Sequence, residues 1–199
     1  MTDDAIPRGL GGEAIAAAAR EVFAERGYHG ASIRDIAKRA GLSLSAMYYW
    51  HASKQDLLAA MLTAGHHEYL EACTAALDAA GPDPADRLVA LVRATVSYRV
   101  RRRVESLIAA QEWRNLDPVH AEPLVASRQA LTRLWARIVE EGVRAGAFDC
   151  PHPEDARRSI QAACNAISQW YDPAGDVSEP ELEQRYADIA LRIVEHRGG

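Results

Sequence analysis

The stretch ASIRDIAKRAGLSLSAMYYWHASKQD, residues 31–56, contains two short apolar segments that each follow a serine and are separated by Gly41. Ser32 stands three residues before Asp35, the spacing of an N-cap with a capping-box partner, and Ser43 can cap a second helix. A helix of about nine residues is not stable by itself, because nucleation costs more than so few hydrogen bonds return. Both helices must therefore pack against neighbours, and the sequence predicts a helix-turn-helix suited to the DNA major groove.

The flanking residues predict helices on both sides of this motif. In residues 12–26 the apolar side chains recur with the spacing of a core-facing helix, at Ile15, Ala18, Ala19, Val22 and Phe23. Gly27 then serves as a C-terminal cap, because glycine adopts the left-handed conformation at little cost. Downstream, Ser53 and Asp56 repeat the Ser-x-x-Asp spacing and open a fourth, longer helix.

Three aromatic residues follow one another in the second short helix. Aromatic residues make up only 7% of the chain, so Tyr48, Tyr49 and Trp50 together are too many for one narrow buried stripe. Met47 is the natural inward contact and Trp50 is expected to pack. The two tyrosines then face outward, where a phenol hydroxyl group can meet a phosphate. The alternative, in which all three rings are buried and Lys54 is a solvated helix end, also fits the sequence.

The rest of the chain has the pattern of long helices. We expect them over residues 54–80, 84–103, 106–113, 131–145, 153–170 and 182–193, with a loop bracketed by residues 115–118 and Pro123. No period-two strand pattern and no internal repeat occurs in the sequence. The predicted fold class is all-α with about nine helices, divided into a three-helix head at residues 1–54 and a larger helical domain at residues 55–199.

The formal net charge of −5 argues against nucleic acid only superficially, because the charges are unevenly distributed. Residues 31–54 form a small cationic island, with Arg34, Lys38, Arg39 and Lys54 against a single acidic residue, Asp35. No run approaches the roughly 18 apolar residues of a membrane span. The N-terminus is not signal-like, so a cytoplasmic protein without a membrane partner is expected.

Neither a metal site nor an enzyme is indicated. Cys73, Cys150 and Cys164 are widely spaced and lack a CxxC pair, which argues against a disulfide framework and a zinc site. The sequence has no GxSxG, no HExxH and no Walker loop. We therefore expect no catalytic residue, no metal and no cofactor.

Residues 27–58 resemble the DNA-binding segment of the TetR (tetracycline-repressor-like) family of bacterial transcriptional regulators. The resemblance lies in the order and spacing of Gly27-Tyr28, Ser32, Ile36-Ala37, Ala40-Gly41, Ser43, Tyr48, Ser53-Lys54 and Leu57-Leu58. It implies that the head binds DNA and that the larger domain binds a small molecule and dimerises. The sequence departs from the family pattern at Leu44 and at His51. A buried neutral imidazole and a phosphate-facing one both fit His51.

The resemblance gives each candidate DNA contact a physical role. The free N–H groups near Ser32 and Ser43 suit phosphate oxygens, and Lys54 adds a point charge to the same strand. Arg34 can reach a guanine or a phosphate, and Leu44 suggests apolar contact with a thymine methyl group. The predicted DNA-binding residues are Ser32, Arg34, Ser43, Leu44, Ser45, Ala46, Tyr48, Tyr49 and Lys54.

The larger domain is implied to supply a ligand pocket and a dimer interface. The predicted ligand-binding residues are Tyr69, Tyr98, Leu107, Trp113, Trp135, Asn165 and Gln169, with His66 and Gln111 as further polar anchors. The predicted dimer interface consists of Ser159, Ala162, Ala163, Ala166, Ile167, Tyr186 and Ile189. For any one of these residues, ordinary core packing is the alternative.

The resemblance also implies a class of effector. Residues 170–194 look like a subset of the family whose effectors include acyl-CoA thioesters, and Arg99, Arg101, Arg102 and Arg103 could supply cations to such a ligand. An unspecified hydrophobic small molecule is the alternative. The expected function is a ligand-responsive repressor that binds an inverted-repeat operator as a homodimer. The competing class is an α-helical small-molecule-binding protein without specific DNA binding.

Overall fold

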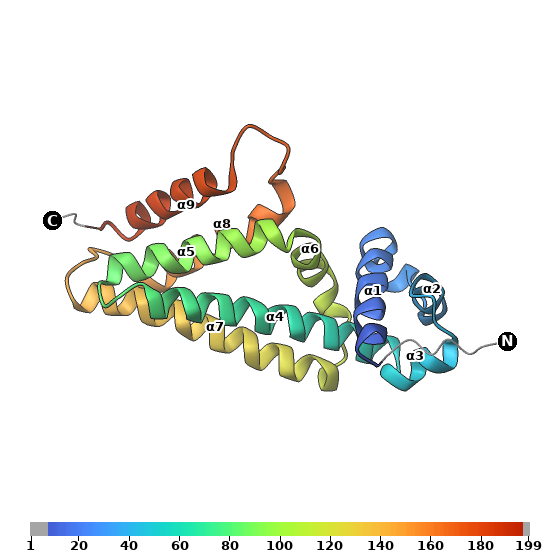
Figure 1. The fold of residues 1–199 in the computed structure, drawn as a ribbon. Helices are drawn as coiled ribbons and strands as arrows, with labels where there is room; N and C mark the ends of the chain where they lie inside the picture. Colours follow the sequence, from blue (N-terminus) through green and yellow to red (C-terminus); the bar gives the residue numbers. More distant parts are fainter. Residues whose placement is uncertain (1–7, 197–199) are drawn as a thin grey trace. The chain divides into compact units, whose positions relative to one another are not determined.

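The computed structural model describes the backbone of residues 8–196 and the side chains from Gly11 onwards (Figure 1). Within these residues the elements are α1 (Arg8–Gly30), α2 (Ile33–Arg39), α3 (Leu44–Trp50), α4 (Lys54–Ala79), α5 (Pro84–Arg101), α6 (Arg103–Glu112), the 3-10 helix η1 (Trp113–Asn115), α7 (Pro118–Arg144), α8 (Pro153–Trp170) and α9 (Glu179–Ile193). A single antiparallel bridge joins Phe148 and His196. The described part of the chain has no β-strand, which confirms the all-α prediction.

The chain divides into two compact units. The head unit contains the residues up to Gly65 together with Val104–Leu124, and the bundle unit contains His66–Arg103 together with the residues from Val125 onwards. The expected boundary after residue 54 therefore does not coincide with this division. The chain passes from one unit to the other within α4, at the start of α6 and within α7.

The head unit has a core of its own that explains this division. The core contains Ile15, Ala18, Ala19, Val22, Phe23, Tyr28, Ala31, Ile33, Ile36, Ala37, Met47, Leu57, Leu58, Leu62, Ile108, Leu116 and Leu124. The last three side chains come from the segment 104–124, which lies far from the others in sequence. Burying a large aliphatic side chain contributes roughly 1.5–3 kcal/mol, so this segment belongs energetically to the head.

The bundle unit is built around α5. This helix packs against α8 and α9 (Figure 1). On another side, Tyr69 of α4 stacks on Tyr98 with ring centres 4.9 Å apart, and its hydroxyl group is 2.9 Å from the Thr95 hydroxyl group. The largest fully buried side chain of this unit is Trp135 of α7.

One close approach in the bundle unit requires a glycine. Gly142 of α7 faces the ring of Phe148, and a Cβ atom at this position would overlap that ring. Phe148 itself is buried and contacts His196 edge to face. The absence of a side chain at Gly142 therefore allows the segment after α7 to fold back on the helix.

The limits of α1 and α7 are among those that differ from the prediction. α1 continues to Gly30, with a kink at Gly27, whose φ of 65° and ψ of 176° form a conformation that essentially only glycine adopts and that differs from the αL conformation of a helix cap. The predicted loop before Pro123 is helical, and this prediction was wrong. Asp117 explains the early start of α7, because its carboxylate accepts a 3.0 Å hydrogen bond from the His120 N–H while Pro118 occupies the first helical position. Pro123 costs the helix one backbone hydrogen bond, which is tolerated there.

Candidate nucleic-acid interface and effector pocket

The helix-turn-helix has the predicted caps. The Ser32 hydroxyl oxygen accepts a hydrogen bond from the Asp35 N–H at 3.1 Å and donates one to the Asp35 carboxylate at 2.6 Å. The hydrogen bond from Ser32 and the nearby Arg26 guanidinium lower the pKa of Asp35. Ser43 caps α3 in the same way, accepting from the Ala46 N–H at 3.1 Å. These bonds stabilise two helices of 7 residues each, which could not persist alone.

Between the two helices lies a tight turn. Gly41 has φ of +70°, a conformation that a larger residue would adopt only with strain, and its N–H donates to the Lys38 carbonyl oxygen at 3.3 Å. The Leu42 N–H donates to the Ala37 carbonyl oxygen at 2.9 Å. The C-terminal carbonyl groups of α2 are satisfied, and the chain is directed into α3.

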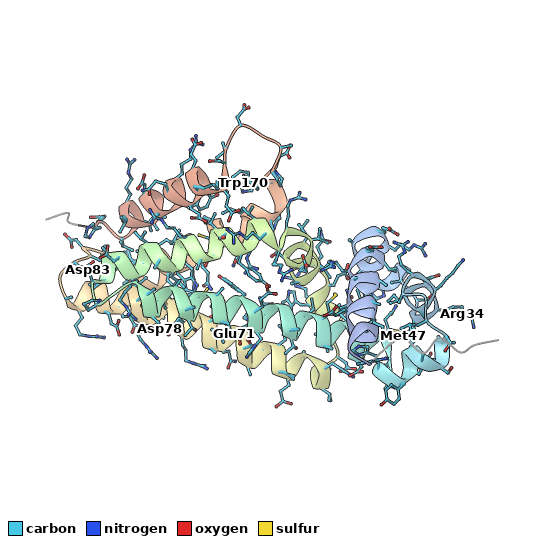
Figure 2. The ribbon with its side chains drawn as sticks, viewed as in Figure 1. Arg34, Met47, Glu71, Asp78, Asp83 and Trp170 are labelled. Atoms are coloured by element: carbon cyan, nitrogen blue, oxygen red, sulfur yellow. The ribbon has the colours of Figure 1, made fainter. Side chains whose placement is uncertain are left out.

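Helix α3 presents its polar and aromatic face outward. Met47 is completely buried in the head core (Figure 2), whereas Tyr48 is 52% exposed and Tyr49 is 74% exposed. Ser45 is exposed, and Leu44 and Ala46 are half-buried. Among the described residues, neither tyrosine hydroxyl group has a hydrogen-bond partner, so both are available to an external phosphate.

Trp50 has the packing role expected of it. Its indole ring lies on the backbone of α1, where Cβ atoms added at Gly11 and Gly12 would approach the ring to 3.3 and 3.5 Å. Tyr49 meets the indole edge to face, with ring centres 6.1 Å apart. The glycine pair at residues 11–12 was the sequence signal for this contact, because two residues without side chains leave a flat surface for a ring.

The cationic island is reduced by pairing within the head. Arg39 makes a two-point contact with the Glu25 carboxylate at 2.6 and 2.9 Å and a further contact with Glu21 at 3.3 Å. The hydrogen bonds that Arg39 donates to Glu25 raise the pKa of Arg39. Arg34 and Lys38 of α2 are exposed, and neither makes an ion pair with any described residue. Figure 2 shows Arg34 pointing away from the head. Both side chains of α2 thus present their charges to solvent.

Lys54 is placed differently from the prediction. Its ammonium group donates to the backbone oxygens of Tyr28 and Ala31 at 2.7 and 2.9 Å and lies over the Tyr28 ring. The side chain is partly buried. In this arrangement the Lys54 ammonium group is bound within the head, at the Tyr28 and Ala31 carbonyl oxygens, whereas a phosphate contact was expected.

The structure gives His51 a partner within the head. It follows α3 as the C-cap, is partly buried, and its Nδ1 atom lies 3.3 Å from the Asp56 carboxylate. Asp56 also accepts a hydrogen bond from the Ala52 N–H at 3.2 Å. His51 therefore lies at the junction of α3 and α4.

The predicted ligand-binding residues are distributed over both units. Tyr69 and Trp135 belong to the core of the bundle unit, with Tyr98 at its edge. Leu107 and Trp113 belong to the head unit, where Trp113 packs against its core. Asn165 and Gln169 are exposed on α8, and Asn165 accepts a hydrogen bond from Arg99 at 3.1 Å. The single apolar cavity that was expected of these residues stays a prediction.

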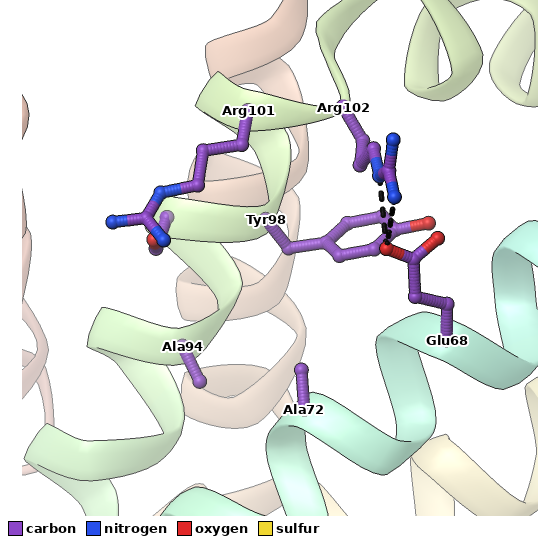
Figure 3. Close-up of a pocket in the computed structure, with 7 residues that line it drawn as sticks. Glu68, Ala72, Ala94, Tyr98, Arg101 and Arg102 are labelled. Carbon is purple, nitrogen blue, oxygen red and sulfur yellow. Dashed lines mark hydrogen bonds and ion pairs between the residues drawn. The ribbon is translucent and has the colours of Figure 1, made fainter.

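The bundle unit has a pocket of about 470 Å³ between α4 and α5 (Figure 3). It is lined by Glu68, Ala72, Ala94, Ser97, Tyr98, Arg101 and Arg102. Of these residues, Tyr98 was a predicted ligand contact, and two of the arginines were candidate cations. The small and acidic residues were missed, because nothing in their local spacing separates a pocket wall from an ordinary helix face.

Both pocket arginines are held by carboxylates. Arg102 donates two hydrogen bonds to one Glu68 oxygen, at 2.9 and 2.6 Å (Figure 3). Arg101 donates to Glu179 of α9 at 2.9 Å, and Ser97 donates to the same oxygen at 2.6 Å. An anionic ligand group in this pocket would have to share these guanidinium groups with the two glutamates.

His66 and Gln111 were the further polar anchors. His66 of α4 is half-buried in the bundle unit and is 2.8 Å from the Ser127 hydroxyl group of α7. Burial and the positive charges of Arg99 and Arg128 lower the pKa of His66 to about 4, so the ring is neutral at pH 7. Gln111 is exposed at the end of α6, in the head unit.

Most of the predicted dimer residues are accessible. Ser159 and Ala162 are exposed on α8, Ala163 and Ala166 are half-buried, and Ile189 of α9 is 45% exposed. Next to them Trp170, which the sequence analysis missed, is 52% exposed and stacks on the half-buried Tyr186. Ile167 is corrected, because it is completely buried in the core of its own bundle unit and cannot meet a partner.

Two other expectations concern absences. Within residues 8–196, no helix combines the length and the hydropathy of a membrane span. In the same part of the chain, no three His, Cys, Asp or Glu side chains are arranged to hold a metal ion. The three cysteines are buried and free, and burial raises the pKa of the Cys73 thiol to about 11.

The capped helices, the buried Met47 and the outward tyrosines define a DNA-binding protein of the helix-turn-helix class, in which a second helical unit accompanies the head. Two family models match this chain. One, described as bacterial regulatory proteins of the tetR family, matches residues 15–61, and the other, described as the tetracyclin repressor-like C-terminal domain, matches residues 81–194. The chain therefore belongs to the TetR family of bacterial transcriptional regulators.

Individual relatives agree with this assignment. The HTH-type transcriptional repressor KstR2 of Mycolicibacterium smegmatis is 27% identical over 175 residues, which cover 87% of this chain and 85% of the relative. A solved tetR-family regulatory protein from Rhodococcus RHA1 is 32% identical with a TM-score of 0.87, over 97% of this chain and all of that one. AibR, solved with isovaleryl coenzyme A and operator DNA, has a TM-score of 0.81 over 93% of this chain and 98% of its own. At 20% identity this last similarity shows the fold alone.

Proposed function

We propose that this protein is a ligand-responsive repressor that binds an inverted-repeat operator as a homodimer and is released from it by a hydrophobic small molecule. The single observation that carries the proposal is the outer face of α3, where Tyr48 and Tyr49 are exposed while Met47 fixes the helix from beneath. A hydroxyl-bearing face on a helix that is anchored in this way fits the major groove.

The DNA contacts are proposed residue by residue. The N-termini of α2 and α3, at Ser32 and Ser43, point N–H groups at phosphates, and the two tyrosine hydroxyl groups donate to phosphates nearby. Arg34 supplies a charge. Leu44, Ser45 and Ala46 are short enough for α3 to approach the base edges, with apolar contact at Leu44. Lys54 acts inside the head and is not among these contacts.

The dimer is proposed to form through α8 and α9. The small side chains of Ser159, Ala162, Ala163 and Ala166 allow a second helix to approach closely, and the exposed Ile189 lies with Trp170 and Tyr186 on the neighbouring surface. Two copies of α3 must be about 34–36 Å apart to read half-sites on one face of B-DNA, which is why the operator is proposed to be an inverted repeat.

The effector is proposed to be an acyl-CoA thioester, the same class as the isovaleryl coenzyme A bound by AibR. Its acyl chain would lie against Ala72, Ala94 and Tyr98 of the bundle pocket, and its phosphates would share Arg101 and Arg102 with their glutamates. A coupling free energy of roughly 3 kcal/mol between effector and operator would change operator affinity about 150-fold, enough to switch a promoter.

The DNA part of the proposal is tested by titration. The purified protein is titrated with the intergenic DNA next to its own gene and with a scrambled duplex of equal length, at several salt concentrations. We expect tight, salt-dependent binding to the first duplex and much weaker binding to the second. Equal affinity for both duplexes would favour a helical small-molecule-binding protein without specific DNA binding.

The dimer and the effector have their own tests. Sedimentation of Ile189→Arg is expected to show monomers, with the wild type dimeric and Val119→Arg, on an exposed face of α7, as the matched control. In a thermal-shift series, acyl-CoAs of increasing chain length should raise the melting temperature more than coenzyme A or the free acids do. Equal shifts from the free acids would make the effector a plain hydrophobic molecule.

A further inference from the structure

Asn115 joins three helices of the head unit through its polar groups. Its side-chain oxygen is 2.9 Å from Nε2 of His29, at the end of α1, and its side-chain amide donates to Glu112, at the end of α6, at 2.6 Å. Its backbone oxygen accepts a hydrogen bond of 2.7 Å from the Gln55 side chain, in the first turn of α4. A single half-buried residue thus connects α1, α4 and α6.

The chemistry of these partners fixes the direction of each bond. The Glu112 carboxylate only accepts, so the Asn115 NH2 group must face it and the Asn115 side-chain oxygen must face His29. His29 in turn must present an N–H at Nε2. Glu112 is itself buried, and its other oxygen lies beside Gly27, the kink of α1. In this arrangement the side-chain oxygen, the side-chain amide and the backbone oxygen of Asn115 each have a partner.

Gln55 makes two hydrogen bonds to the backbone around Asn115. Besides donating to the Asn115 carbonyl group, its side-chain oxygen accepts from the Asp117 N–H at 3.2 Å. The preceding residue, Lys54, binds the carbonyl groups of Tyr28 and Ala31 on the other side. The first turn of α4 thus holds the α1–α2 junction with one residue and the segment around Asn115 with the next.

We propose that Asn115 is a positioning residue for operator recognition. It holds the end of α1 in register with the first turn of α4, and α2 and α3 follow directly from that end. The segment 104–124 is bounded in sequence on both sides by residues of the bundle unit, although Ile108, Leu116 and Leu124 belong to the core of the head. This inference rests on the proposed function and adds a residue that touches no DNA.

The test compares specific with non-specific DNA binding. Asn115→Ala and Gln55→Ala are titrated with the intergenic duplex and the scrambled duplex, at a temperature well below melting. Val119→Ala, a 77% exposed residue of the same segment, is the matched control. We expect each of the first two variants to lower the ratio of specific to non-specific affinity about tenfold, and the control to leave it unchanged.

A double variant separates positioning from general stability. If the two residues act through one contact, Asn115→Ala with His29→Ala should weaken operator binding by the same factor as Asn115→Ala alone. A lower melting temperature with an unchanged affinity ratio would mean a merely structural role and would overturn the inference. If wild-type protein fails to distinguish the two duplexes, the proposed function fails first and the inference with it.

Discussion

The Lys54 ammonium group lies 4.1 Å from the centre of the Tyr28 ring and donates a 2.7 Å hydrogen bond to the backbone oxygen of the same residue. A second bond reaches the Ala31 carbonyl oxygen. The charge is thus placed at the end of α1, where the helix dipole carries partial negative charge and a cation is stabilising. The contact joins the start of α4 to the residues that lead into the helix-turn-helix.

Replacing Lys54 with methionine should therefore act through stability. We expect the free energy of unfolding of the head unit to fall by about 2 kcal/mol, because hydrogen bonds from a charged donor are lost. The salt dependence of DNA binding should stay unchanged. Urea denaturation, with hydrogen exchange as the probe, measures the free energy of unfolding. DNA titrations at several salt concentrations measure the salt dependence of binding.

Arg34→Met is the matched control for that variant. It should reduce the salt slope by about one with no change in stability, because Arg34 is exposed and makes no ion pair among the described residues. A reduced slope for Lys54→Met with unchanged stability would restore the direct phosphate contact.

Substitutions at the tyrosines of α3 should, unlike Lys54→Met, change DNA affinity and leave stability unchanged. Tyr48→Phe and Tyr49→Phe are each expected to weaken operator binding about fivefold, the effect of one lost hydrogen bond, while the melting temperature stays constant. Tyr171→Phe is the control, because its buried hydroxyl group donates to the Val177 carbonyl oxygen at 2.9 Å within the bundle unit. Tyr171→Phe should lower the stability of the protein and leave its DNA affinity unchanged. If both α3 variants keep full DNA affinity, the tyrosine hydroxyl groups do not contact DNA.

Gly142→Ala should destabilise the bundle unit by about 1–3 kcal/mol, because the added methyl group overlaps the Phe148 ring. Differential scanning calorimetry gives the effect. Adding Phe148→Ala should make the glycine substitution nearly neutral in that background. If Gly142→Ala lowers stability equally in the wild-type and the Phe148→Ala backgrounds, overlap with the Phe148 ring is not the cause of the loss.

His66 should make the bundle unit sensitive to acid. Its pKa is about 4 in the folded protein, below the ordinary 6.5, so the unfolded chain binds a proton that the folded chain does not. Stability should therefore fall as the pH drops from about 6.5 towards 4 and be insensitive to this group at higher pH. The melting temperature of His66→Gln, which keeps a partner for Ser127, should depend less on pH across that interval. An identical dependence in both proteins would show that other groups titrate.

Local chemistry made the head predictable. The serine caps, the left-handed glycines and the inward Met47 depend on neighbours within four residues, which sequence spacing records directly. The positions of Lys54 and Ile167 differ from the expected ones for a common reason. A lysine at the start of a helix is typical of an exposed charge, and an isoleucine among small residues is typical of a helix–helix interface. The actual neighbours of Lys54 and Ile167 come from parts of the chain that are distant in sequence. Pro123 led to the prediction of a loop, whereas the N-cap at Asp117 starts α7 before Pro123.

The pocket was the least predictable feature. Its wall combines α4 and α5 through residues such as Ala72 and Ser97, whose types are common on any helix. Leu107 and Trp113 were grouped with the bundle because they follow α5 in sequence, whereas their segment shares the core of the head. Assigning them correctly required knowing that the chain returns to its first unit after Arg103.

The return of the chain to the head unit after Arg103 also determines when the head can finish folding during synthesis. The DNA-reading helices leave the ribosome first, but the core beneath them also contains Ile108, Leu116 and Leu124. Until those side chains emerge, the newly made N-terminal helices have an apolar surface without its cover. A nascent chain that stalls before this point should therefore need chaperone protection, although its DNA-reading sequence is already complete.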